Sequence, residues 1–146
     1  MKREMTLSES QLLVDAGVDP NTADMVILHE EPYETSETKF DGVHQILCVP
    51  YKDFAKNHPR YKNISYFPAW SLECLLDVIP DEIIRESKTN EEEYDELSVE
   101  LLKYDCRYSI IFRNEEEQEI VEEFEYEWLT ECCVHAIVWL KTNKYI

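Results

Sequence analysis

The chain has 146 residues, of which 44% are hydrophobic and 12% aromatic. This is enough apolar material for one domain with its own core, and it excludes a disordered chain. There are 32 acidic and 14 basic residues, a net charge of −18, and residues 81–131 alone hold 19 acidic against 5 basic side chains. A field of that sign repels nucleic-acid phosphates. We therefore expect no nucleic-acid binding and predict a protein partner with a basic surface, although the same charge also serves solubility.

The first predicted element is a helix that begins after Thr6 and ends at Gly17. Thr6 and Glu9 have the spacing of a capping box, and a glycine at the far end suits the left-handed turn that closes many helices. A short helix opening at Asp19 and Pro20 should follow, then short strands at residues 25–28 and 45–49. The acidic, Thr-rich and Ser-rich stretch between these strands, residues 30–44, is predicted to be a loop.

Residues 51–62 form a basic-aromatic segment in an otherwise acidic chain. It is a candidate partner-binding surface, for an acidic partner or for single-stranded nucleic acid, and basic and aromatic side chains interleave along it. The alternative is a loop that neutralises the protein's own acidic surface, and the surrounding negative charge favours that alternative. The candidate residues are Tyr51, Lys52, Lys56, Arg60, Tyr61 and Lys62.

The second half of the chain changes from helical to strand periodicity. A helix is predicted within residues 68–80, where apolar residues recur at helical spacing, and an acidic loop at residues 90–96. Alternating patterns predict a strand at residues 104–112, a turn at 114–118, a returning strand at 120–126 and a third strand at 97–103.

A closing helix is predicted at residues 128–142. Its buried centre should consist of Leu129, Cys133, Ala136 and Leu140, flanked by Cys132 and Ile137. Together these elements predict an α+β fold, a small antiparallel β-meander packed against amphipathic α-helices, with residues 1–146 forming a single domain.

The number of cysteines, five, is odd, and no two of them form a CxxC motif. Four of them lie in apolar or alternating stretches typical of small buried side chains, so we expect five free thiols and no stoichiometric zinc. The first residues lack an apolar signal-peptide core, and the longest apolar run, residues 132–140, is too short to span a bilayer. We therefore expect a cytoplasmic protein without membrane association. The cysteines are Cys48, Cys74, Cys106, Cys132 and Cys133.

No motif for cofactor-dependent chemistry is present. The two glycines, Gly17 and Gly42, stand alone, so no phosphate-binding loop or nucleophile elbow can be formed. Cys132, Cys133 and His135 do not converge on a helix, and the other histidines show no metal-binding spacing. Acidic pairs are too numerous to select a catalytic pair. We expect no catalytic residues, no cofactor and no metal.

Three stretches carry a resemblance to a known family. They are TLSESQLLVDAGVDPNTADM at residues 6–25, PAWSLECLLDVIP at 68–80 and CCVHAIVWLKTNKYI at 132–146, about a third of the chain. They resemble, in the same order, a family of small uncharacterised acidic proteins carried by prophages and mobile elements of gut bacteria. The resemblance implies a phage-related or bacterial accessory protein and brings no catalytic residues.

The resulting hypothesis is a non-enzymatic accessory protein that acts by protein–protein binding. Two alternatives stay open: an acidic mimic of nucleic acid that inhibits a host factor by occupying its basic groove, and an enzyme with an unrecognised site. A row of outward carboxylates at phosphate-like spacing would favour the mimic, whereas a deep cleft with a cysteine–histidine contact would favour the enzyme.

Overall fold

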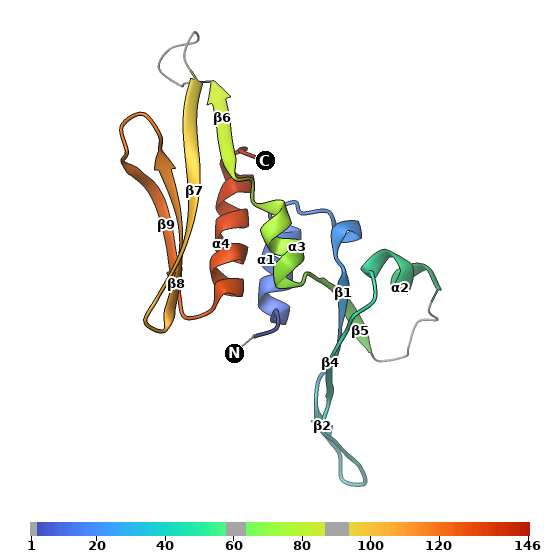
Figure 1. Ribbon diagram of the computed structural model, residues 1–146. Coiled ribbons are helices and arrows are strands. Elements are labelled where there is room, and N and C mark those ends of the chain that lie inside the picture. Colours follow the sequence, from blue (N-terminus) through green and yellow to red (C-terminus); the bar gives the residue numbers. More distant parts are fainter. Residues whose placement is uncertain (1–2, 58–63, 87–93) are drawn as a thin grey trace. The chain divides into compact units, whose positions relative to one another are not determined.

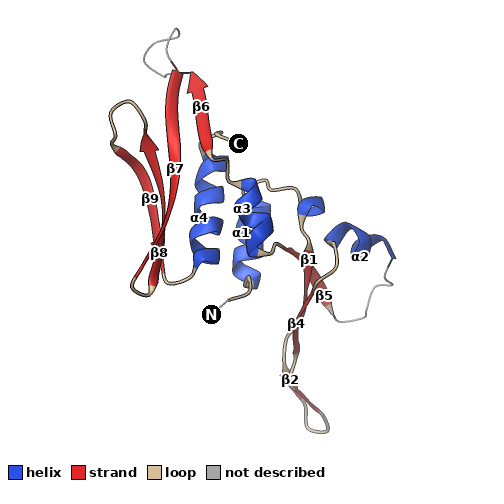
Figure 2. Cartoon of the chain, viewed as in Figure 1, coloured by secondary structure: helices blue, strands red, loops and turns tan. Residues whose placement is uncertain are grey.

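The computed structural model describes residues 3–57, 64–86 and 94–146. It combines α-helices with antiparallel sheets, so the predicted α+β fold is confirmed (Figures 1 and 2). The contacts between residues define two compact units, Met5–Cys74 and Leu75–Ile146, the latter joined by Met1–Glu4. The single domain over residues 1–146 stays a prediction.

In the unit Met5–Cys74, helix α1 (Leu7–Asp15) begins and ends as its sequence predicts. The Thr6 hydroxyl accepts from the Glu9 backbone N–H at 3.2 Å, and the Glu9 carboxylate accepts from the Thr6 N–H at 2.9 Å. These two bonds satisfy amide groups that a helix start leaves free. Gly17 follows the helix at φ +99°. The predicted short helix is the 3₁₀ turn η1 (Pro20–Thr22), capped by the Asp19 side chain.

A three-stranded antiparallel sheet forms the centre of this unit. Its strand order is β4 (Val43–Leu47), β1 (Met25–Glu30), β5 (Ser65–Ala69). The strands at 25–28 and 45–49 were predicted, with slightly different ends. Strand β5 was not predicted, since its last two residues lie in the stretch 68–80, whose apolar spacing predicts a helix.

The predicted loop at residues 30–44 is wrong in part. Strands occupy its two ends, and a small hairpin of β2 (Tyr33–Glu34) and β3 (Lys39–Phe40) forms within it, with the rings of Tyr33 and Phe40 stacked at 5.1 Å. Cross-strand aromatic stacking and local turn hydrogen bonds stabilise this hairpin despite its polar composition.

Gly42, at φ +87°, precedes β4, and a Cβ there would lie 2.8 Å from the Glu30 carbonyl oxygen. Only glycine fits this close approach.

Helix α2 (Tyr51–Asn57) follows β4 and covers part of the sheet. Phe54 is buried, and its ring meets Tyr66 of β5 edge-on at 5.3 Å. The core of this unit continues through Leu13, Ile27 and Trp70, all nearly inaccessible to solvent.

Helix α3 (Leu72–Val78) lies within the stretch 68–80, as predicted, and runs from one unit into the other. The Ser71 hydroxyl accepts from the Cys74 backbone N–H at 3.2 Å, and the Asp24 carboxylate accepts from the Ser71 N–H at 2.8 Å. The start of the helix is thus capped by a serine that an aspartate holds in place.

In the unit Leu75–Ile146 the chain forms a four-stranded antiparallel meander. The strands follow each other in space as in sequence: β6 (Glu82–Glu86), β7 (Tyr94–Tyr104), β8 (Arg107–Asn114) and β9 (Ile120–Tyr126). The predicted hairpin and third strand are confirmed. The predicted strand start at Tyr104 is wrong, because Asp105, at φ +51°, and Cys106 form the turn between β7 and β8. Of the predicted acidic loop at 90–96, residues 94–96 belong to β7 and the others lie outside the described residues.

Helix α4 (Leu129–Thr142) packs on β8 and β9. The predicted buried residues Cys132, Cys133, Ala136, Ile137 and Leu140 are all inaccessible, whereas Leu129 is only half-buried. The Trp139 ring lies 4.8 Å from that of Phe112 on β8, which fixes the side of the sheet that faces the helix. None of the described helices combines the length and apolar character needed to cross a membrane.

Candidate functional site

The most distinctive surface of the described chain is the face of the β6–β7–β8–β9 sheet opposite α4. Phe112 faces the helix, so its neighbour Ile111 points to the other side. In antiparallel pairing, directly opposed residues share a face, and Ile111 pairs with Glu100 and Glu123. The same alternation brings several carboxylates onto this surface, here called the acidic face. Its strand carboxylates are Glu82, Glu96, Glu100, Glu123 and Glu125.

Two arginines partly neutralise the acidic face. Arg113 lies 3.4 Å from Glu100, and Arg107 lies 2.9 Å from Glu125. Among the residues that the structure describes, no lysine or arginine pairs with the strand carboxylates Glu82, Glu96 or Glu123, although the Ser109 hydroxyl lies 3.3 Å from Glu123. The face therefore keeps a net negative charge.

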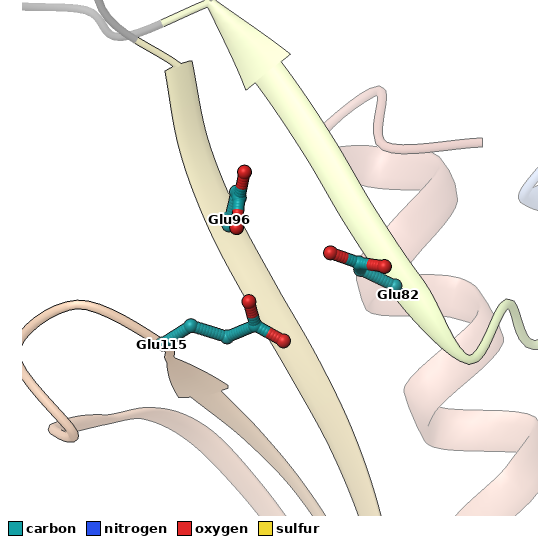
Figure 3. A group of neighbouring side chains, drawn as sticks. All are labelled: Glu82, Glu96 and Glu115. Atoms are coloured by element: carbon teal, nitrogen blue, oxygen red, sulfur yellow. The ribbon is translucent and has the colours of Figure 1, made fainter.

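At one end of the acidic face, Glu115 reaches over from the turn after β8 to join Glu82 and Glu96 (Figure 3). One oxygen from each carboxylate lies within 4.8 Å of the others. The backbone fixes this approach, since the Glu115 N–H donates to the Glu96 carbonyl oxygen at 3.0 Å. The Asn114 side chain accepts from the next two N–H groups and holds the turn closed.

These three carboxylates are the only group of potential metal ligands of that size and closeness in the described chain. All-oxygen ligands suit calcium or magnesium, but calcium sites use 6–8 oxygens, and three surface carboxylates provide fewer. We therefore treat the three glutamates as the most negative part of the acidic face rather than as a metal centre.

Crowding changes the protonation of this cluster. A hydrogen bond with Glu96 raises the pKa of the Glu115 carboxyl above its ordinary value, and partial desolvation and the charges of Glu82 and Glu96 act in the same direction. A carboxyl whose pKa is higher in the folded state favours folding at low pH. That contribution disappears as the pH rises through the raised pKa.

We therefore predict that Glu115→Gln raises the melting temperature at pH 7, because it removes a carboxylate that two neighbours repel. The gain should shrink as the pH falls below the raised pKa, where wild-type Glu115 is itself protonated. Thermal melts from pH 4 to 8 measure this. Glu116→Gln, at an exposed position in the same turn, is the matched control, and an equal gain from both variants would contradict the prediction.

The basic-aromatic segment predicted as a partner-binding surface is only partly described. Tyr51, Lys52 and Lys56 lie on α2, so this part is a helix rather than a loop, whereas Arg60, Tyr61 and Lys62 lie outside the described residues. Tyr51 is half-buried with its ring 6.0 Å from that of Tyr66, and burial raises the pKa of its hydroxyl. Part of the aromatic character thus serves packing. Lys52 and Lys56 are exposed, and partner binding through them stays a prediction.

The cysteines do not all lie where their local patterns suggest. All five are free thiols, but only Cys132 and Cys133 are buried; Cys74 is half-buried, and Cys48 and Cys106 are exposed. The expectation of four packing cysteines is therefore wrong, because Cys106 lies in a turn and Cys48 just beyond the end of β4. Burial raises the pKa of Cys132 to about 11 and that of Cys133 to about 12. Both are thus protonated at neutral pH and unsuited to nucleophilic attack.

A small apolar cavity lies in the same unit as the acidic face. Its volume is about 180 Å³, below the range of about 300–1,000 Å³ typical of small-molecule sites. Asp81 is its one ionisable residue, which offers no pair of groups for acid–base or nucleophilic chemistry. The cavity is lined by Leu76, Ile79, Pro80, Asp81, Val99, Leu101 and Ile110.

No known protein family, curated protein or solved structure matches this chain.

Proposed function

We propose that this protein acts by binding a partner protein with a basic surface, and that the acidic face of the four-stranded sheet is its contact surface. The observation that carries the proposal is the strand register, which gathers carboxylates from β6, β7 and β9 on the side of the sheet opposite α4. A rigid sheet holds these charges in fixed positions, and preorganised charge favours both encounter and orientation with a complementary surface.

The composition supports the same proposal. The net charge of −18 attracts basic proteins over distances of about 8–10 Å at physiological salt and repels nucleic acid. The family resemblance implies an accessory protein of bacterial or phage origin, and such a role is compatible with a chain that acts by binding another protein.

A second candidate, the mimic of nucleic acid, would require a row of outward carboxylates at phosphate-like spacing. Glu123 and Glu125 follow one another on the same face of β9, about 6.8 Å apart along the strand. Charges on a DNA strand recur every 3.4 Å along the helix axis. The two glutamates of β9 thus lie at about twice that interval, and further carboxylates lie on strand β7, on the other side of β8.

The test uses two triple variants of equal charge. Glu82, Glu96 and Glu123 are replaced by glutamine in one variant. In its control, three exposed glutamates outside the acidic face, Glu34, Glu37 and Glu73, are replaced in the same way. Wild type and control should retain the same partner from a host lysate, with capture falling as salt is raised, whereas the variant of the acidic face should lose it.

Capture of the partner to the same extent by both triple variants would show that the acidic face has no special part in binding. That result would contradict the proposal. Competition then separates the two candidates. A partner released by short duplex DNA uses its nucleic-acid site, as a mimic requires. A partner that stays bound in the presence of DNA is held through another basic surface.

A further inference from the structure

Two histidines far apart in the sequence lie side by side in the sheet of the other unit. His29 on β1 pairs directly with His44 on β4, and their ring centroids are 5.9 Å apart at an angle of 77°. Side chains directly opposite one another on antiparallel strands have Cβ atoms about 4.5–5.5 Å apart. The two imidazoles therefore project from the same face of the sheet within reach of a common ligand.

A carboxylate fixes the protonation pattern of one ring. His29 Nε2 lies 2.8 Å from Glu31 Oε1, and an ionised carboxylate can only accept a hydrogen bond. Nε2 therefore carries the hydrogen, and in the neutral ring the lone pair is on Nδ1.

That second nitrogen has no partner. The Nδ1 atom of His29 is buried and forms no hydrogen bond with any described residue, although the side chain as a whole is 23% exposed. Burial of an unpaired polar atom is unfavourable, and a bound water or ion is one explanation for such an atom. A histidine that donates one ring N–H to a carboxylate and presents the other nitrogen free is the arrangement found at metal ligands.

We propose that His29 Nδ1 and a ring nitrogen of His44 bind one divalent transition-metal ion such as Zn²⁺, and that Glu31 orients His29. With zinc–nitrogen bonds of about 2.0–2.1 Å and tetrahedral angles, two imidazoles on one zinc have centroids about 5 Å apart. The observed 5.9 Å is within about 1 Å of that value, a shift that small rotations of the two rings provide. Water completes the coordination of the ion.

The chemistry of the ligands separates this site from the three glutamates of the acidic face. Imidazole nitrogen favours zinc, nickel and copper, whereas carboxylates alone favour calcium and magnesium. Because only two histidines bind the ion, we expect the protein to lose the metal during purification and to bind it again when metal is added. The spacing of these histidines along the sequence does not indicate a metal site, because only the pairing of β1 with β4 brings them together.

The experiment titrates Zn²⁺ into the full-length, tag-free protein by calorimetry, with wild type compared to the variants His44→Gln, Glu31→Gln, His135→Gln and Glu115→Gln. Wild type should bind one zinc. His44→Gln should bind at least tenfold more weakly, and Glu31→Gln about tenfold, as is typical for loss of a carboxylate that orients a metal-bound histidine. The control His135→Gln changes a histidine on α4 stacked 4.7 Å from Tyr126 and should bind as wild type does.

Circular dichroism establishes that each variant is folded, and His44 is exposed, so its replacement should leave the sheet intact. Zinc should also shift the ring signals of His29 and His44, and not those of His135, in histidine-detected NMR spectra. Failure of wild type to bind zinc, or equal binding by wild type and His44→Gln, would overturn the proposal. Loss of zinc binding in Glu115→Gln but not in His44→Gln would assign the ion to the acidic face instead.

Discussion

Replacing Phe112 by alanine should lower the free energy of unfolding by about 3–5 kcal/mol. Phe112 on β8 is completely buried, and its ring contacts Trp139 of α4 at 4.8 Å and Phe124 of β9 at 6.2 Å. Alanine leaves a cavity between sheet and helix that neither rigid element can close, so both the transfer energy and the packing contacts are lost. Chemical denaturation followed by far-ultraviolet circular dichroism measures the effect.

The control for Phe112 lies on the neighbouring strand. Ile120 of β9 is 50% exposed, and Ile120→Ala should cost less than about 1 kcal/mol. A loss below about 1 kcal/mol for Phe112→Ala as well would mean that α4 does not pack on the sheet as described.

Replacing Trp70 by alanine should have an effect of similar size, about 3–5 kcal/mol, in the unit Met5–Cys74. Trp70 follows β5, is 1% exposed, and its indole N–H donates to the Thr22 hydroxyl at 3.1 Å. Alanine loses the buried rings and leaves the space between η1 and the start of α3 unfilled. Trp70→Phe keeps most of the ring volume, loses the hydrogen bond and should cost distinctly less.

Leu12→Ala is the matched control for Trp70. Leu12 lies on α1 and is 40% exposed, and alanine is a good helix former, so its replacement should cost less than about 1 kcal/mol. Equal losses for Leu12→Ala and Trp70→Ala would contradict the core described for this unit.

Together, the Phe112 and Trp70 variants also test the prediction of a single domain, because each destabilises a different unit. If residues 1–146 fold as one domain, both variants should shift one common unfolding transition. Two transitions, each shifted by only one of the variants, would mean that the units fold independently.

The elements that could be predicted are those whose signals are local. The capping box of Thr6 and Glu9 and the apolar stripe of α4 predicted two helices. The alternation on either side of Asn114 predicted the hairpin of β8 and β9. In each case neighbouring residues determine the conformation, and few distant contacts are needed.

The elements that were missed depend on distant partners. Strand β5 contains Pro68, which cannot donate a hydrogen bond, and it is tolerated because β5 lies at the edge of its sheet. Helix α2 was not predicted, and the burial of Phe54 against Tyr66 stabilises it. Neither the edge position of β5 nor the contact between Phe54 and Tyr66 can be predicted from a window of neighbouring residues.

The acidic face and the histidine pair also depend on contacts between residues that are distant in the sequence. Composition showed that residues 81–131 are acidic, but only the register between strands reveals which carboxylates share a face with Ile111. The pairing of His29 with His44 depends on the alignment of β1 and β4, and a shift by one residue would place the two rings on opposite faces. The glycine before β4, Gly42, fits tightly against the Glu30 carbonyl and helps to hold that alignment.

Strand β9, the last of the meander, has a consequence for how the protein behaves among copies of itself. An edge strand presents unpaired backbone groups that can recruit another chain. Here the strand has a bulge opposite Phe112 and Arg113 and carries Glu122, Glu123 and Glu125. Charge and irregular pairing both discourage edge-to-edge polymerisation. Glu123 and Glu125 of the acidic face, together with Glu122 on the other face of β9, therefore also protect against fibril growth, and this protection depends on their ionisation.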